Sequence, residues 1–398
     1  MANDLKVVCI CVAVLVCCAS VRAGTQADLA NQAEQLIKQG STQEALDTLA
    51  KAAEASPASA QSEDRIGFLY AVVQHASEAI DHFQKSIALD PSYAVAHFHL
   101  GIALWNQNET DRGTAELEQA VKLAPDVADY RVRLASAYEK LGRALQGKGD
   151  LAGAARQLEH AVDTDPNNDV TRNEYAFLLI ETRQPDRGIA EARTVLTHKP
   201  NDTSALMNIG YAYLKTGEFD TAEKSYRQAL AVDPKLPAAH YDLALALKMQ
   251  DQLEAAQKEF EETIRLDPSL PQAHYSLGIT YWQLGDFPTT IKEMRAAIGI
   301  APEYAEAHYM LGIVLKQTGD LDEAISELKE AIRLDPSTPG PFNTLGQILR
   351  LKGDKAGSEE AFATGARLKR EKESQLASSL DQGMRGGETL KPLSTEPR

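Results

Sequence analysis

The sequence has no cysteine after residue 18, because Cys9, Cys11, Cys17 and Cys18 are its only four. Beyond these residues the chain can form neither a disulfide framework nor a thiolate nucleophile. Basic residues are outnumbered, with 41 lysines and arginines against 57 aspartates and glutamates, giving a net charge of −16. No basic stripe is visible, so the composition argues against nucleic acid as a partner.

Catalytic motifs are also lacking. The sequence contains no G-x-S-x-G, no H-E-x-x-H and no phosphate-binding loop. Serines and histidines are present, but no spacing singles out a nucleophile with its base. We therefore expect no enzyme, no cofactor, no metal site and no small-molecule substrate.

What the sequence does contain is a repeat. Nine prolines recur every 34 residues, with a single gap of 41. They are Pro57, Pro91, Pro125, Pro166, Pro200, Pro234, Pro268, Pro302 and Pro336. A fixed period of this length is typical of arrays in which each unit packs only on its neighbours.

Small residues follow the same step and the same gap. One series runs through Gly67, Gly101, Ala135, Ala176, Gly210, Ala244, Gly278, Gly312 and Gly346, and a second series, beginning at Ala45 and Ala79, runs beside it. We expect these positions to mark where the second helix of each unit approaches the first. Small side chains permit such an approach.

The unit from Pro268 to Pro302 shows the pattern most clearly. Leu277, Gly278 and Tyr281 fall on one helical face. Gly285 then supplies a left-handed helix end, and Pro288 suits the first turn of the next helix. The spacing therefore predicts two helices in each unit.

This pattern resembles the tetratricopeptide repeat. The stretch from Ala305 to Gly312, Ala-Glu-Ala-His-Tyr-Met-Leu-Gly, reproduces the family's small and large positions, and Leu334-Asp335-Pro336 reproduces its closing proline. These two sequence stretches are similar to repeats of bacterial envelope proteins and of the O-linked sugar transferases, but no transferase domain follows. The resemblance implies an all-α fold, a right-handed α-solenoid of about ten helix-turn-helix repeats over residues 26–372.

The two ends of the chain differ from the repeats. Residues 1–23 place Lys6 before an apolar run and end in Val21-Arg22-Ala23, which predicts a secretory signal peptide. Alternatives are an uncleaved anchor, or lipid attachment through Cys17 or Cys18. We expect an exported protein, periplasmic or extracellular, with membrane contact only if the leader is retained or lipidated.

Two further departures concern the array itself. The unit over residues 128–168 carries seven extra residues, and helical spacing continues through them, so we expect a lengthened first helix. At the other end, residues 373–398 are rich in charge. They predict a polar helix extension followed by a flexible tail from about Ser379.

In the family, one face of the first helix of each repeat lines a concave groove. The corresponding positions here carry an aromatic and an aliphatic residue, with tryptophan or lysine at the edge. These groove candidates are Phe98, Ile102 and Trp105; Tyr241, Leu245 and Lys248; Tyr275, Ile279 and Trp282; and Tyr309, Ile313 and Lys316. Such a surface suits a peptide. The alternative is that these side chains only complete the contact between neighbouring repeats.

Four histidines also share one register: His97, His240, His274 and His308. A column of imidazoles suggests a metal site or a pH switch. However, the family usually has a large packing residue at this position, so we expect these rings to serve packing.

We therefore expect a scaffold or adaptor that binds peptide or helical segments of other proteins in its concave groove. The alternative is a regulatory subunit of a cell-envelope enzyme, such as a hydrolase or glycosyltransferase. The sequence does not identify the partner, because repeat frameworks leave the groove free to vary.

Overall fold

The computed structural model describes residues 25–56 and 58–386, with side chains as far as residue 378. Within these ranges every regular element is a helix, which confirms the all-α prediction. The chain divides after Gln184 into two compact units, and we describe each unit separately. The predicted leader and residues 387–398 lie outside the described residues.

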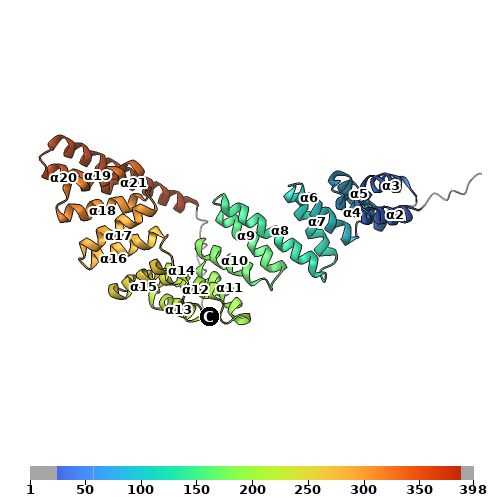
Figure 1. Cartoon of the computed structure of the whole chain (residues 1–398), viewed down its shortest axis with the longest axis horizontal. Helices are drawn as coiled ribbons and strands as arrows, with labels where there is room; N and C mark the ends of the chain where they lie inside the picture. Colours follow the sequence, from blue (N-terminus) through green and yellow to red (C-terminus); the bar gives the residue numbers. More distant parts are fainter. Residues whose placement is uncertain (1–24, 57, 387–398) are drawn as a thin grey trace, which may run out of the picture. The chain divides into compact units, whose positions relative to one another are not determined.

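The first unit contains helices α2 to α10. Their bounds are α2 Gln26–Lys38, α3 Thr42–Glu54, α4 Ala60–Val72, α5 Ala76–Leu89, α6 Ala94–Asn106, α7 Thr110–Leu123, α8 Ala128–Gly147, α9 Leu151–Thr164 and α10 Asp169–Glu181. Each of α2, α4, α6 and α8 packs against the helix that follows it (Figure 1). The first helices α2, α4 and α6 also contact one another in turn.

The second unit contains helices α11 to α21. Their bounds are α11 Pro185–His198, α12 Thr203–Thr216, α13 Phe219–Val232, α14 Pro237–Met249, α15 Leu253–Leu266, α16 Pro271–Gln283, α17 Phe287–Ile300, α18 Ala305–Thr318, α19 Leu321–Leu334, α20 Pro339–Leu351 and α21 Lys355–Gly386. Helices α12 to α21 form five hairpins that stack in chain order.

The turns follow the residue types that the repeat supplies. Pro271 occupies the first turn of α16, where its missing N–H has no helical partner. Gly217 and Gly319 end α12 and α18 with positive φ, a conformation that glycine adopts without a steric penalty. In the turn before α16 the Asp267 carboxylate accepts hydrogen bonds from the backbone N–H and the hydroxyl of Ser269.

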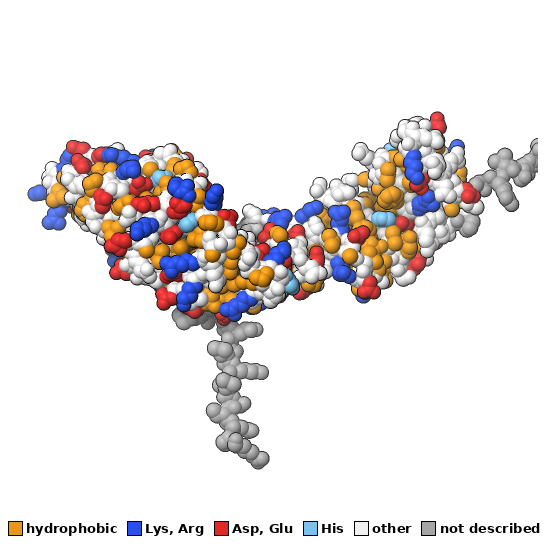
Figure 2. Space-filling view, turned by 60° about the horizontal axis from the view of Figure 1, so that its bottom comes forward, with side chains coloured by type: hydrophobic (Ala, Val, Ile, Leu, Met, Phe, Trp, Pro, Cys, Tyr) orange, Lys and Arg blue, Asp and Glu red, His pale blue; other side chains and the backbone are white. Residues whose placement is uncertain are grey.

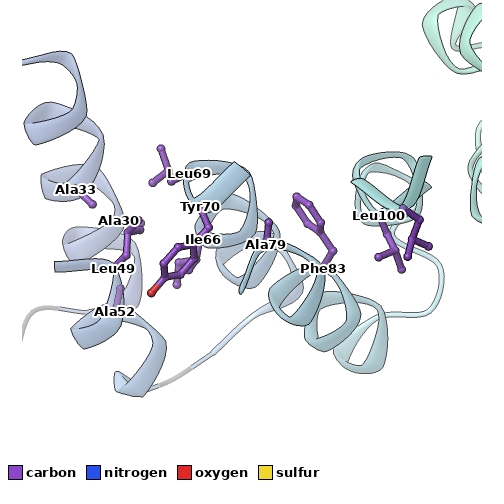
Figure 3. Close-up of a cluster of buried hydrophobic side chains, with 11 residues drawn as sticks. Ala30, Ala33, Leu49, Ala52, Ile66, Leu69, Tyr70, Ala79, Phe83 and Leu100 are labelled. Atoms are coloured by element: carbon purple, nitrogen blue, oxygen red, sulfur yellow. The ribbon is translucent and has the colours of Figure 1, made fainter. Parts of the chain in front are cut away.

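The core lies between successive helices. In the first unit it combines small residues with larger ones, and Figure 3 shows the side chains of Ile66, Ala79 and Phe83 filling the spaces between neighbouring helices. Ile66 and Ala79 are fully buried and Phe83 is almost so. Burial of such side chains stabilises each hairpin by roughly 25 cal/mol per Å² of apolar surface.

The small-residue series confirms the predicted close approach of the two helices. A Cβ atom placed on Gly210 would lie 2.6 Å from the ring of Tyr226, and one on Gly312 would lie 2.7 Å from Leu328. Tyr226 and Leu328 belong to the second helix of the same hairpin and are fully buried. Each glycine therefore leaves the space in which a large side chain of its partner helix packs.

Two helices depart from the common length. Helix α8 has 20 residues and returns to α9 through Gly149, which has a positive φ. Helix α21 continues to Gly386, eight residues past the point where we expected the tail to begin. Good helix formers such as Ala377 and Leu380, with no proline before Pro392, account for the continuation.

Across residues 25–56 and 58–386, no helix has the length and apolar character required to cross a bilayer.

The close contact between Gly210 and Tyr226 can be tested directly. Gly210→Ala is expected to destabilise the second unit by about 1–3 kcal/mol, because the added methyl group overlaps the buried Tyr226 ring. Gly299→Ala is the matched control, since nothing lies within 4 Å of the added atom. It should stabilise by about 0.4–1 kcal/mol. Urea unfolding followed by circular dichroism measures both, and equal effects would contradict the close contact.

Candidate functional site

The structure places all twelve groove candidates on the first helices of their hairpins, and every one is partly exposed. Phe98, Ile102 and Trp105 lie on α6 in the first unit. The other nine lie on α14, α16 and α18 in the second unit. The apolar ones pack on one side against the buried core and leave the other side uncovered.

The groove candidates of the second unit also connect neighbouring hairpins. The hydroxyl groups of Tyr241 and Ser276 lie 3.2 Å apart, and the Tyr275 ring lies 5.1 Å from that of Tyr304. The indole N–H of Trp282 donates to the Gln317 side chain at 2.9 Å. These residues therefore contribute to packing between repeats in addition to forming part of the exposed face.

The wall formed by α6 and α8 in the first unit carries aromatic and basic groups. Phe98 stacks on Tyr130 with ring centroids 4.5 Å apart, and the Lys140 ammonium lies 5.7 Å from the centre of the Trp105 ring. Arg133 lines two adjacent hollows, one beside Phe98 and one beside Trp105. Aromatic faces attract cations in this arrangement.

The second unit has a larger cavity of about 450 Å³ between the N-terminal ends of α14 and α16. It is lined by Pro237, Ala238, Tyr241, Asp242, Asp267, Leu270, Gln272 and Ala273. Most of these side chains are apolar, and the two carboxylates are the charged groups among them. Tyr241 is the groove candidate that forms part of this wall.

Asp242 is the unusual member of the cavity. It is partly buried, and burial raises the pKa of its carboxyl group to about 7. Within the described residues it makes no ion pair and no hydrogen bond, although buried carboxylates are normally satisfied in one of these ways. At the other end of α14, burial lowers the pKa of the Lys248 ammonium.

The buried hydroxyl of Tyr226 adds to this polar environment. It has no hydrogen-bond partner among the described residues, and burial together with the Asp242 charge raises the pKa of its phenol.

The histidine column serves to join helices. Nδ1 of each ring contacts a glutamate 19 residues later on the second helix, at 2.6 or 2.7 Å: His97 with Glu116, His240 with Glu259, His274 with Glu293 and His308 with Glu327. In three of the four, Nε2 lies 3.1 or 3.2 Å from the carbonyl oxygen of the proline six residues earlier. Each such ring links both helices to the preceding turn, as the packing interpretation predicted.

The described residues contain no cluster of three or more histidine, cysteine, aspartate or glutamate side chains that could hold an ion.

Sequence reasoning missed two features of this region. The glutamate partners of the histidines recur with the same 34-residue step, so they could have been found as a further series. Asp242 carries no such signal, because one acidic residue on a helix face is usually solvated.

Comparison with known proteins now identifies the family. Models described as "TPR repeat" match residues 76–108, 210–251 and 250–285, and models described as "Tetratricopeptide repeat" match residues 99–169, 145–210 and 275–339. Together these matches run from residue 76 to residue 339. The chain belongs to the tetratricopeptide repeat family.

Curated relatives match parts of the chain. The protein STIP1 homolog of Dictyostelium discoideum is 27% identical over 150 residues, which are 37% of this chain and 25% of the relative. The wheat (Triticum aestivum) Hsp70-Hsp90 organizing protein is 35% identical over 92 residues, 23% of this chain and 15% of the relative. The human mitochondrial import receptor subunit TOM70 is 27% identical over 172 residues, 41% and 28% respectively. The matches thus span less than a third of these relatives.

Two solved structures are also similar to parts of the chain. A Pseudomonas aeruginosa pilF structure is 18% identical, covers 56% of this chain and 99% of its own, and has a TM-score of 0.47. A MamA protein structure is 22% identical, covers 49% of this chain and 98% of its own, and has a TM-score of 0.40.

Removing one of these histidine side chains should lower the free energy of unfolding. His308→Ala should destabilise the second unit by about 1–3 kcal/mol, because the Glu327 carboxylate and the Pro302 carbonyl lose their shared partner. Lys329→Ala, on the exposed side of the same second helix, is the control and should change stability by less than about 0.5 kcal/mol. A double-mutant cycle between His308 and Glu327 checks the pairing. Zero coupling energy would show that the contact contributes nothing.

Asp242 predicts a pH dependence of stability. Because its folded pKa, about 7, lies above the unfolded value near 3.8, the folded chain binds the extra proton between these limits. Its contribution to stability therefore falls as pH rises from about 4 to 7, by at most about 1.4 kcal/mol per pH unit. Asp242→Asn removes this contribution, so the stability of the variant relative to the unsubstituted chain should increase across that window. A pH-independent difference in urea midpoint would exclude the raised pKa.

Proposed function

We propose that this protein is a scaffold or adaptor that binds peptide segments of other proteins on the exposed face of its first helices. One observation carries the proposal: side chains at a single register, many of them aromatic, are held from beneath by the core and remain open on their outer side. Tyr241, Tyr275 and Tyr309 show it in successive hairpins. Rings fixed in this way offer contact area with little loss of side-chain entropy on binding.

The surface composition supports the same function. Figure 2 shows areas of hydrophobic side chains interrupted by charged ones of both signs. Exposed apolar residues on the first helices include Phe68, which is 47% exposed, and Met249, which is 60% exposed. Contiguous apolar surface with polar surroundings is typical of protein interaction sites.

The names of two relatives also support the binding of other proteins. One is an Hsp70-Hsp90 organizing protein and another is a subunit of a mitochondrial import receptor. Both names describe proteins that work on other proteins, and we extend only this class of partner to the present chain. Export, which rests on the leader-like residues 1–23, is part of the proposal.

A displayed library of random twelve-residue peptides tests the binding function on the purified chain. We expect enrichment of a defined set of peptides, and the double substitution of Tyr275 and Trp282 by alanine should weaken their binding at least tenfold. Because both side chains also pack on the next hairpin, some loss of stability is expected, so binding is measured below the onset of unfolding.

The control removes the same kind of surface elsewhere. Val232 and Ile300 are exposed apolar residues on second helices, and their joint substitution by alanine should leave peptide binding unchanged. Equal losses in the two double variants, or no enrichment with the unsubstituted chain, would refute the proposed function.

A further inference from the structure

The cavity between α14 and α16 combines three properties that together restrict its occupant. It has a volume of about 450 Å³, enough for a long side chain together with part of its backbone. Its walls are mainly apolar, with contributions from Pro237, Leu270 and Ala273. At one side of these walls lies the Asp242 carboxylate, which has no partner among the described residues.

The other charged and titratable groups around Asp242 do not satisfy it. The second carboxylate of the cavity, Asp267, already accepts two hydrogen bonds from Ser269, which lower its pKa. The phenols of Tyr226 and Tyr241 lie on α13 and α14, and His240, two residues before Asp242, directs Nδ1 to Glu259 on α15. No lysine, arginine or histidine is found among the described residues that line the cavity.

We propose that this cavity binds a lysine or arginine side chain of a peptide partner, with Asp242 as the counter-ion. The inference rests on the proposed function and names the chemistry of one of its subsites. The apolar walls accept the methylene groups of a long cationic side chain, and the carboxylate receives its charged end. A small metal ion fits poorly, because it would require several oxygen ligands in place of Pro237, Leu270 and Ala273.

A cationic side chain of a peptide would form an ion pair with the Asp242 carboxylate. A partly buried carboxylate without a partner is destabilising, and a bound guanidinium or ammonium group would pair it. Recognition then depends on the ionised carboxylate. The affinity for a basic peptide should therefore fall about tenfold from pH 8 to pH 6, following the loss of ionised Asp242 with its pKa of about 7.

The random peptide library provides the test when it is selected in parallel on three forms of the full chain. The unsubstituted chain should enrich peptides with lysine or arginine at one fixed position. Asp242→Asn should lose this preference and bind the enriched peptides at least tenfold more weakly. Asp251→Asn removes the same charge from an exposed turn of the same repeat and should behave as the unsubstituted chain.

The control is needed because a chain with a net charge of −16 attracts cationic peptides without any specific site. If Asp251→Asn weakens binding as much as Asp242→Asn, general electrostatics explain the preference and the inference fails. Enriched peptides with no basic position, or with binding insensitive to Asp242→Asn, overturn the inference and leave the proposed function intact. No enrichment on any form overturns both.

A charge exchange completes the experiment. Asp242→Lys should reject the basic peptide and accept its counterpart with glutamate at the fixed position. Circular dichroism on each variant establishes that the helices are retained. The pH dependence of basic-peptide binding should disappear in Asp242→Asn, and its persistence there would assign the titration to another group.

Discussion

The whole structure depends on one contact, in which a large side chain of the second helix packs against a small residue of the first helix. Tyr226 on Gly210, Met294 on Gly278 and Leu328 on Gly312 repeat this contact in three hairpins of the second unit. It sets the spacing between the paired helices, because a β-carbon at any of these glycines would overlap its partner. Dense packing of this kind tolerates little change in volume, so the small series is the strictest part of the repeat.

This contact also determines which surface is free. The second helix covers one side of the first helix, and the first helices of adjacent hairpins, such as α12 with α14 and α18 with α20, cover another. The second helix of the preceding hairpin packs against the first helix as well, and the groove candidates lie on the side that the described elements leave partly exposed. That geometry explains why all twelve groove candidates are partly exposed although most of them are apolar. The histidine–glutamate links hold the paired helices together without occupying this side.

The helical hairpins could be predicted because their determinants are local. Pro271, Gly217 and the small series each act within one repeat, and the 34-residue step displays them several times. The groove register could be predicted for the same reason, since i, i+4 and i+7 spacing defines a helix face. Contacts between repeats could not be predicted. The bond from Trp282 to Gln317 depends on the rotation from one hairpin to the next, which no single repeat encodes.

Asp242 shows a second limit of sequence reasoning. An acidic residue near the start of a helix normally indicates a solvated side chain favoured by the helix dipole. Here the raised pKa arises from partial burial in a cavity that Asp242 shares with residues of the neighbouring hairpin, and such burial is a property of the assembled repeats. The residue type can be read from the sequence, whereas only the packing reveals that this carboxylate is partly shielded from water.

The position of Asp242 also indicates how one frame can serve different partners. At the same position of the repeat, the first unit has His99 and Arg133, and the second has Ser276 and Met310 in the next two hairpins. The residue type at this position therefore differs between hairpins, whereas Gly278 and Gly312 keep the small series in the hairpins that carry Ser276 and Met310. Because each repeat contacts only its neighbours, the energetic cost of a buried charge stays within its own hairpins. A binding surface can therefore change residue by residue while the fold that holds it remains constant.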